Sequence, residues 1–294
     1  MMLHEVAIIG AGPAGVACAI QLKRSGIKPV VVEKSRIGGM LYEANLVENY
    51  PGFPNGIPGY KLAELMKLQF ESEDIQTVDG AVSDVEFASG TYQLKVGSRK
   101  LYSKVLVVST GTKPKFFTGL KGNGSLISYE TERFRNVKRK TIVIIGAGDL
   151  AFDYALRFGQ YNRIILLNRS SKVKCIELLR LRCNSLKHFS YFEKTVVVSA
   201  FECVPGKIRL DCIQNGNAIS FKADHVIGAI GREQNTDFVL RNSTCRLKEL
   251  RMSGKLFIIG DAANGKYRQA SVAAGDGVKT AMKIRTKLMN ADWK

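Results

Sequence analysis

The chain has 294 residues, 45% of them hydrophobic, which is enough to build two domains with buried cores and excludes a disordered or fibrous protein. Its 44 Lys and Arg residues exceed its 26 Asp and Glu residues, and the net charge of +18 favours acidic or phosphate-bearing partners. No segment approaches the roughly 18 consecutive apolar residues of a membrane span, and an apolar run follows the N-terminus at once. We therefore expect a cytoplasmic protein that makes no membrane contact.

Residues 6–33 have the pattern of a βαβ unit with a glycine fingerprint at its first turn. An apolar run at 6–9 is followed by Gly10-Ala11-Gly12-Pro13-Ala14-Gly15, then by a helical stretch to about Arg24 and a second strand that ends at Glu33. This order of elements predicts a dinucleotide site, whereas an isolated glycine-rich turn would more often be purely structural.

The residue types in this turn match the needs of such a site. Gly10 makes a tight turn, Gly12 lets the backbone approach a pyrophosphate, and Gly15 lets the helix pack close to the strand. The free N–H groups of the helix N-terminus then face the phosphates. Glu33 is placed to accept hydrogen bonds from the two ribose hydroxyls.

A second copy of the pattern begins at Thr141. An apolar run at 141–145 is followed by Gly146-Ala147-Gly148-Asp149-Leu150-Ala151, a helical stretch and a strand at 163–167. Asp149 lies in the turn that opens the helix, where we expect it to cap the helix rather than to contact an anionic cofactor. Two nucleotide sites in one chain favour FAD in one and a pyridine nucleotide in the other, because hydride transfer needs a donor and an acceptor.

The two units differ at the ribose position. Glu33 lies 23 residues after Gly10, and the same offset from Gly146 reaches Arg169, with Lys172 and Lys174 just beyond. A guanidinium attracts a 2′-phosphate that a carboxylate would repel, so the second unit is predicted to bind NADPH. NADH, another electron donor, or a merely solvated basic loop are the alternatives.

Three other apolar segments, at 105–112, 226–231 and 256–263, each end in a glycine-containing turn. The first two are interpreted as strands that lead the chain to a domain crossover. The third ends in Gly260-Asp261, where a carboxylate can meet ribityl or phosphate oxygens. The last helix is predicted from about Ala270 to Met289.

The six cysteines form no CxxC motif and no disulfide framework, and the three histidines are scattered, so no metal site is expected.

Together these motifs resemble the thioredoxin reductase family in order and spacing, over nearly the whole chain. The motifs that carry the resemblance are Gly10 to Gly15, Glu33, Gly38-Gly39, 47–54, Thr110-Gly111, 229–232, Gly260-Asp261 and 267–270. The resemblance implies an α/β fold with two Rossmann-like three-layer nucleotide-binding domains. An FAD-binding domain would comprise residues 1–112 and 231–294, with an NAD(P)H-binding domain of residues 113–230 inserted into it.

The predicted cofactor-binding residues follow from the fingerprints and from this resemblance. Where the family has Gln after the Gly-Gly pair, this chain has Met40. The full set is Gly10, Gly12, Pro13, Ala14, Gly15, Glu33, Lys34, Gly39, Met40, Asn49, Val82, Thr110, Gly111, Gly146, Gly148, Asp149, Ala151, Arg169, Lys174, Gly231, Gly260, Asp261, Gln269 and Ala270.

The chain departs from the family in its redox chemistry. Thioredoxin reductases carry a redox-active CxxC just before the second glycine fingerprint, where this chain has Ser128 to Phe134 with two glutamates about where the thiols would stand. A carboxylate cannot exchange with a disulfide. Cys175 and Cys183 lie eight residues apart on a predicted helix, too far for one disulfide, and are interpreted as ordinary small residues.

Residues 148–155 instead resemble the thioredoxin reductase-like ferredoxin-NADP reductases, which also lack the thiol pair. We therefore expect an FAD-dependent NAD(P)H oxidoreductase that passes electrons through the flavin to an acidic carrier such as ferredoxin or flavodoxin. We expect no catalytic acid or base, because the flavin carries the chemistry. The alternatives are a diverged thioredoxin-disulfide reductase and a flavin- or nucleotide-sensing module without turnover.

The charge distribution supports an acidic partner. Residues 1–112 carry no net charge, residues 113–230 carry +11 and residues 231–294 carry +7. In the last helix Lys279, Lys283 and Lys287 recur every four residues, opposite an apolar face of Ala281, Ile284 and Leu288. We interpret this stripe as a steering surface for the carrier, with a solvated face as the alternative. Nucleic acid is not expected, and the expected assembly is a homodimer.

Overall fold

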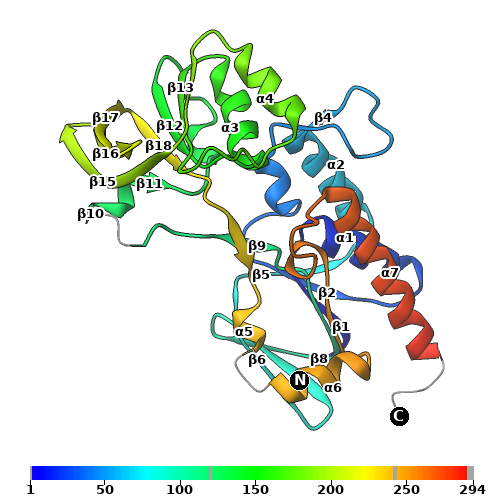
Figure 1. Ribbon diagram of the computed structural model, residues 1–294. Coiled ribbons are helices and arrows are strands. Elements are labelled where there is room, and N and C mark those ends of the chain that lie inside the picture. Colours follow the sequence, from blue (N-terminus) through cyan, green and yellow to red (C-terminus); the bar gives the residue numbers. More distant parts are fainter. Residues whose placement is uncertain (1, 119–120, 241–243, 290–294) are drawn as a thin grey trace. The chain divides into compact units, whose positions relative to one another are not determined.

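The computed structural model describes residues 2–118, 121–240 and 244–289. Its internal contacts divide the chain into two compact units (Figure 1). Unit 1 comprises Met1–Tyr42, Val47–Lys113 and Gln234–Lys294, and unit 2 comprises Glu43–Leu46 and Pro114–Glu233. The chain thus enters unit 2 twice, once for the long segment and once for only four residues.

Unit 1 is built on a mixed seven-stranded sheet in the order β5-β2-β1-β8-β7-β6, with β20 also paired to β8. The long strand β8 has two partners along one edge: its first half pairs antiparallel with β7 and its second half parallel with β20. The strands are β1 (Leu3–Ile9), β2 (Val30–Glu33), β5 (Gln76–Asp79), β6 (Val82–Ala88), β7 (Thr91–Val96), β8 (Arg99–Val108) and β20 (Leu256–Ile258).

The parallel part of this sheet is apolar on both faces because both faces are covered. Helices α1 (Pro13–Arg24) and α7 (Ala270–Met289) pack closely together, since a Cβ atom at Gly277 would lie only 2.2 Å from the Ala14 carbonyl oxygen. The predicted last helix is confirmed. The other elements of this part of the chain are α2 (Gly59–Ser72), α5 (Asp237–Leu240), α6 (Thr244–Met252), η1 (Gly39–Glu43), η4 (Gly260–Ala262), β3 (Leu46–Val47) and β4 (Ile57–Pro58).

Unit 2 has a parallel five-stranded sheet in the order β11-β18-β12-β13-β14. Alternate residues of its central strands enter two different cores: Ile142 and Ile144 pack with α3 (Asp149–Gly159), while Val143 and Ile145 pack against an antiparallel meander. The strands are β11 (Ile127–Ser128), β12 (Thr141–Ile145), β13 (Arg163–Leu167), β14 (Phe189–Phe192) and β18 (His225–Gly228).

The meander forms a second sheet in the order β10-β15-β16-β17. Its hairpin at Asn215-Gly216 has positive φ at both residues, as a two-residue turn with this sequence requires. The elements that complete unit 2 are β10 (Lys121–Gly122), β15 (Thr195–Val204), β16 (Lys207–Gln214), β17 (Asn217–Ala223), α4 (Glu177–Asn184), η2 (Gly124–Leu126) and η3 (Glu132–Phe134).

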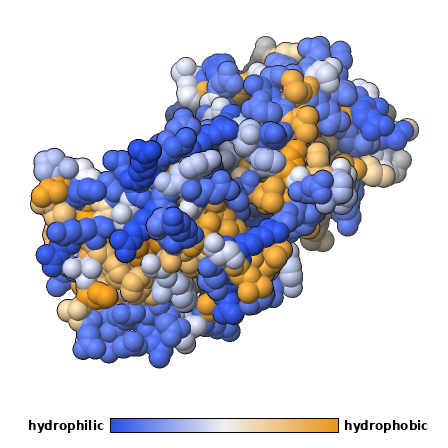
Figure 2. Space-filling model, turned by 90° about the horizontal axis from the view of Figure 1, so that it is seen from above, coloured by the Kyte–Doolittle hydropathy of each residue, from blue (hydrophilic) through white to orange (hydrophobic). Residues whose placement is uncertain are grey.

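Two short strands, β9 (Thr112–Pro114) and β19 (Arg232–Gln234), pair where the chain passes between the units. The expected α/β class with Rossmann-like sheets is confirmed. Most of the face shown in Figure 2 is hydrophilic, with apolar side chains in separate groups. None of the described helices combines the length and the apolar composition that crossing a bilayer would require.

Candidate functional site

The first glycine turn is held by close backbone contacts. Gly10 has a φ of +98°, and a Cβ atom there would lie 2.6 Å from the Ser109 carbonyl oxygen. At Gly15 a Cβ atom would lie 1.9 Å from the Gly10 carbonyl oxygen. The Ser109 hydroxyl lies within hydrogen-bond distance of the carbonyl oxygens of Ile9 (2.9 Å) and Gly10 (2.8 Å). Sequence reasoning missed Ser109, because its role depends on a strand 100 residues away from the turn.

Gly12 is different, because no heavy atom lies within 4 Å of the Cβ atom it lacks. The half-buried Glu33 closes the side of the turn: one carboxylate oxygen accepts from the Ala11 N–H at 2.6 Å and the other from the Ser35 N–H at 2.9 Å. The arrangement combines open space beside a helix N-terminus with a carboxylate at the end of β2. These are the features that a pyrophosphate and a ribose need.

Two predicted residues that are distant in sequence come together in unit 1. The Asn49 side-chain amide donates a hydrogen bond to Gln269 Oε1 at 2.8 Å, across 220 positions of sequence. The Gly260 turn is held by Asp276 of α7, which accepts from the Gly260 N–H at 3.2 Å and from Asn264 Nδ2 at 2.6 Å. Sequence reasoning missed Asp276, although its place nearly two turns into the last helix could have suggested it.

The remaining predicted residues of unit 1 are more dispersed. Gly39 approaches the first turn, where its Cβ atom would lie 3.2 Å from Gly12 Cα, whereas Lys34 and Met40 are exposed. Val82 pairs with Val96 in the β6–β7 ladder. The others begin helices or follow strands: Pro13 and Ala14 open α1, Thr110 and Gly111 follow β8, Asp261 lies in η4 and Ala270 opens α7.

The second turn repeats the geometry of the first. Gly146 has a φ of +141°, and a Cβ atom there would lie 2.2 Å from the Ala229 carbonyl oxygen. Gly148 again has open space where its Cβ atom would be. Ala151, at the position equivalent to Gly15, is fully buried, so this helix tolerates a methyl group at its packing position. Gly231 lies in unit 2 by contacts, where its carbonyl oxygen accepts from the Lys115 N–H at 3.0 Å.

The prediction that Asp149 caps α3 is wrong. Gly148 is the N-cap residue, and the Asp149 side chain makes no capping hydrogen bond. Its carboxylate instead accepts from the Ile176 N–H at 2.9 Å. The carboxylate thus binds the N–H of a residue distant in sequence instead of an N–H in the first turn of its own helix. Asp149 thereby fixes the segment that follows the basic loop.

That basic loop lies beside the second turn. The Lys174 N–H donates to the Ala147 carbonyl oxygen at 2.8 Å, and Lys174 forms an isolated parallel β-bridge with Gly148. The Asn168 side chain organises the loop by accepting from the Ser170 N–H at 3.1 Å and donating to the Lys172 carbonyl oxygen at 3.2 Å. Arg169, Lys172 and Lys174 are exposed, and within residues 121–240 none of them forms an ion pair. The loop therefore presents three cations near an open helix N-terminus.

The segment where thioredoxin reductases carry their thiols is occupied by a different network. Thr131 is fully buried, and its N–H and hydroxyl both donate to Glu43 Oε2. Arg157 of α3 donates to the Glu43 carbonyl oxygen at 2.9 Å. The short Glu43–Leu46 segment is thus held in unit 2 by hydrogen bonds to Thr131 and Arg157. Sequence reasoning missed Glu43, since no local motif marks it.

The same segment has a second attachment to α3. The Asn45 N–H donates to Asp153 Oδ2 at 2.8 Å. Burial raises the pKa of Asp153 to about 6, although the Asn45 hydrogen bond and the charge of Arg157 oppose the shift. Burial also raises the pKa of the neighbouring Tyr154, whose hydroxyl has no hydrogen-bond partner among the described residues.

The described cysteines are all free. Cys175 and Cys183 do not share a helix as predicted, because α4 begins at Glu177 and Cys175 precedes it. Burial raises the pKa of the Cys183 thiol to about 12, which makes it unreactive as a thiolate. In the part of the chain that the structure describes, no group of three or more potential metal ligands is present.

The lysine stripe of α7 is less uniform than predicted. Lys279 and Lys283 are exposed, but Lys287 is half-buried and its ammonium donates to the Ser253 carbonyl oxygen at 2.8 Å. Lys287 therefore binds the end of α6 rather than facing solvent. Ala281 and Ile284 are fully buried, as the opposite face requires.

Comparison with known proteins is consistent with this geometry. Residues 4–277 match the family model of the pyridine nucleotide-disulphide oxidoreductases. The chain is 28% identical to thioredoxin reductase 2 of Arabidopsis thaliana, over 95% of this chain and 80% of that protein. It is 27% identical to the thioredoxin reductase of Chlamydia trachomatis, over 98% of this chain and all of that protein.

Its fold is similar to the crystal structure of Lactococcus lactis thioredoxin reductase, with a TM-score of 0.87 at 21% identity and with 98% and 99% of the two chains covered. Two glycine turns, each followed by a helix, are therefore found in a chain that matches these proteins over nearly its whole length. The chain belongs to the pyridine nucleotide-disulphide oxidoreductase family and is a thioredoxin reductase-like, flavin-dependent NAD(P)H oxidoreductase.

Proposed function

We propose that this protein passes electrons from NADPH through FAD to a small acidic electron carrier of the ferredoxin or flavodoxin type, without a redox-active dithiol. The observation that carries the proposal is the environment of Thr131. Where the relatives named thioredoxin reductases would need two thiols, this chain has the buried Thr131, which is hydrogen-bonded to Glu43. Electrons that reach the flavin then find no disulfide among the described cysteines.

The residues present fit the two cofactors. FAD would lie at the first turn, where Gly12 leaves room for a pyrophosphate and Glu33 stands at the end of β2. NADPH would lie at the second turn, where Gly148 leaves the same room and Arg169 meets the 2′-phosphate. The flavin supplies the step between hydride transfer and one-electron transfer. The protein would supply position and charge. It would hold the phosphate groups of both cofactors at helix N-termini, and where the first turn has Glu33 the second has Arg169, so no carboxylate there repels the 2′-phosphate.

An acidic carrier is supported by the distribution of exposed charge. The inserted segment 113–230 has a net charge of +11, while 1–112 has none. On α7, Lys279 and Lys283 lie on the exposed face beside Val278 and Met282, which are 39% and 56% exposed. A surface that combines cations with apolar side chains suits a transient protein partner, because the charges speed association and the apolar groups contribute contact.

The test begins with anaerobic addition of NADPH to the FAD-loaded protein. Bleaching of the flavin followed by reduction of ferredoxin or flavodoxin is expected. Reversing Lys279 and Lys283 to Glu should lower the carrier rate by about ten-fold at low salt and flatten its salt dependence, since screening already removes the attraction at high salt. Flavin reduction by NADPH should stay unchanged.

The matched control reverses Lys95 and Lys100, two exposed lysines that face each other across the β7–β8 ladder. It makes the same change of net charge in the electrically neutral part of the chain and should leave the carrier rate within about two-fold. Equal carrier rates in wild type and the Lys279/Lys283 variant would remove α7 from the docking surface.

A second candidate function is disulfide reduction through an external dithiol, favoured by the names of the curated relatives. In that case, reduction of DTNB by NADPH would require added thioredoxin, and no carrier would be reduced. A flavin-sensing module without turnover would instead bind FAD and show no bleaching with NADPH. These outcomes are mutually exclusive, so one set of reactions separates the three functions.

A further inference from the structure

A cavity of about 460 Å³ lies in unit 2 at the end of the five-stranded sheet where β18 begins, which is the end opposite the second glycine turn. It meets the sheet at His225 and Val226, which begin β18, whereas the Gly146 turn follows the other end of β12. Because these strands are parallel, the cavity and the nucleotide turn are separated by the length of the sheet. The cavity is therefore distinct from the proposed NADPH site.

The floor of this cavity is apolar. Phe134, Ile208 and Val226 are buried there, and Leu126 and Val137 are half-buried beside them. The Phe134 ring lies 4.8 Å from the His225 ring, centroid to centroid. Two adjacent rings next to aliphatic side chains suit contact with a flat apolar group.

The rim is positively charged. The exposed Arg133 guanidinium lies 4.7 Å from the Phe134 ring centroid, and within the described chain it has no hydrogen-bond or ion-pair partner. His225 lies at the same rim, where burial lowers its pKa and so favours the neutral imidazole, which retains one N–H donor. A free guanidinium therefore stands beside an N–H donor at the mouth of an apolar cavity.

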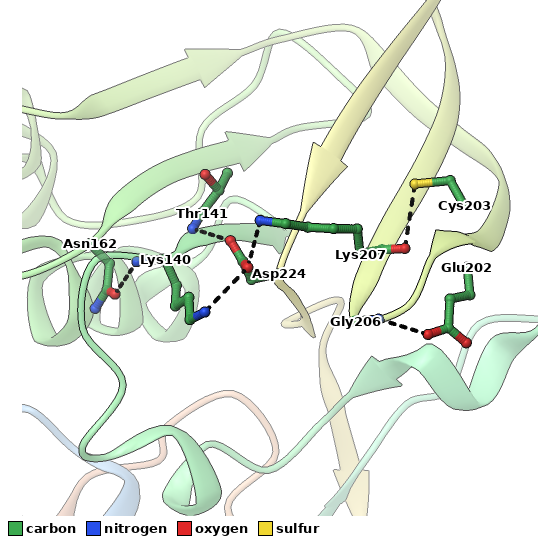
Figure 3. Close-up of polar contacts among 8 residues, drawn as sticks. All are labelled: Lys140, Thr141, Asn162, Glu202, Cys203, Gly206, Lys207 and Asp224. Atoms are coloured by element: carbon green, nitrogen blue, oxygen red, sulfur yellow. Dashed lines mark hydrogen bonds and ion pairs between the residues drawn. The ribbon is translucent and has the colours of Figure 1, made fainter.

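The acidic residue adjacent to the cavity does not cancel this charge. Figure 3 shows both Lys140 and Lys207 directed at Asp224. Their ammonium groups lie 3.7 Å and 2.7 Å from Asp224 Oδ1, while Oδ2 accepts from the Thr141 N–H at 2.9 Å. The carboxylate is fully occupied by its own partners, and the trio keeps a net charge of +1.

We propose that this cavity binds a small amphipathic anion, an aromatic carboxylate whose ring packs beside Phe134 on the half-buried Leu126 and Val137 and whose carboxylate meets Arg133 and His225. The planar guanidinium can donate two parallel hydrogen bonds to a carboxylate, which favours a carboxylate over a spherical anion such as chloride. The cavity volume lies within the usual range for small-molecule sites, about 300–1,000 Å³.

The test is calorimetric titration of the FAD-loaded protein with 2-naphthoate, with uncharged 2-naphthamide and with acetate. Naphthoate is expected to bind, the amide at least ten-fold more weakly, and acetate not measurably, because one lacks the charge and the other the ring. Arg133→Ala should weaken naphthoate binding at least ten-fold. Arg163→Ala removes another exposed arginine, at the start of β13 and outside the cavity lining, and should change nothing.

Two further measurements keep the result decisive. Val137→Trp should fill the cavity and abolish binding, while FAD content and the melting temperature report that the fold is retained. Saturating NADP⁺ should leave the naphthoate affinity unchanged. The proposal is overturned if naphthoate and naphthamide bind equally, if Arg133→Ala and Arg163→Ala behave alike, or if NADP⁺ displaces naphthoate, which would place the anion at the second glycine turn.

Discussion

The two glycine turns share their framework and differ in the parts that select a ligand. In both, the first glycine has a positive φ and lies so close to a neighbouring carbonyl that a side chain would clash, and in both the second glycine is open. They differ at the helix-packing position, Gly15 against Ala151, and at the ribose position, Glu33 against Arg169. Backbone geometry is thus common to both turns, and we expect the charge at the end of the second strand to decide which nucleotide each turn prefers.

The helices behind the turns differ as well. Helix α1 packs on α7 through small residues, with the Gly277 backbone close to Ala14. Helix α3 instead uses polar side chains: Asp149, Asp153 and Arg157, four residues apart along one face, bind three separate backbone groups. Both helices are packed into cores, but only α3 adds these long-range hydrogen bonds from ionisable side chains, so the two should respond differently to substitution and to pH.

The largest difference is expected between two glycines of the same turn. Gly15→Ala places a methyl group 1.9 Å from a carbonyl oxygen, so α1 must shift, at a cost of about 1–3 kcal/mol or more, and FAD should be lost. Gly12→Ala has room and should leave the apo-protein melting temperature unchanged while weakening FAD binding. Melting temperature and FAD per chain after desalting measure both effects. Full FAD retention in Gly12→Ala would mean that no phosphate approaches Gly12.

The next largest effect concerns Glu33. If Glu33 binds the ribose as proposed, Glu33→Ala removes charge-assisted hydrogen bonds worth about 1.5–3 kcal/mol, which is a loss of about 10- to 150-fold in FAD affinity. Glu33→Gln keeps the size and one acceptor and should lose less. FAD titration of the apo-protein gives both affinities. If neither variant binds FAD more weakly than wild type, Glu33 serves only the Ala11 and Ser35 N–H groups.

The hydrogen-bonded helix α3 predicts a pH effect that α1 does not. The pKa of Asp153 is raised from 3.8 to about 6 in the folded protein, so the folded state binds this proton more tightly than the unfolded state. Its contribution to stability is complete below about pH 4 and is lost as the pH rises through 6, by at most about 3 kcal/mol. Asp153→Asn should therefore match wild type at pH 4 and exceed its melting temperature at pH 7.5. A constant difference across this range would contradict the raised pKa.

The smallest expected effect is the nucleotide preference of the second turn. Arg169→Ala should raise the KM for NADPH about ten-fold and leave that for NADH nearly unchanged, because only the contact to the 2′-phosphate is lost. Arg163→Ala, at the other end of β13, provides the control for a changed surface charge. A wild-type preference for NADH would show that the replacement of Glu by Arg does not select the nucleotide.

The sequence alone determined the two βαβ units, their turns and the Arg169 offset, because each depends on local constraints. Positive φ, close backbone approach and strand periodicity restrict residue type at fixed spacing along the chain. The wrong prediction for Asp149 marks the limit of this reasoning. Its carboxylate would cap the helix only if no other backbone N–H lay near it, and the Ile176 N–H does lie near it.

Only the tertiary structure decided which distant groups satisfy one another. The Glu43–Thr131 and Asn45–Asp153 hydrogen bonds span 88 and 108 positions, and they bring a four-residue segment of the N-terminal half into unit 2. The Lys287–Ser253 contact removes one lysine from a stripe that periodicity alone would expose. Local propensity contains no information on such pairs, because a buried polar group takes whichever partner the packed chain places nearest to it.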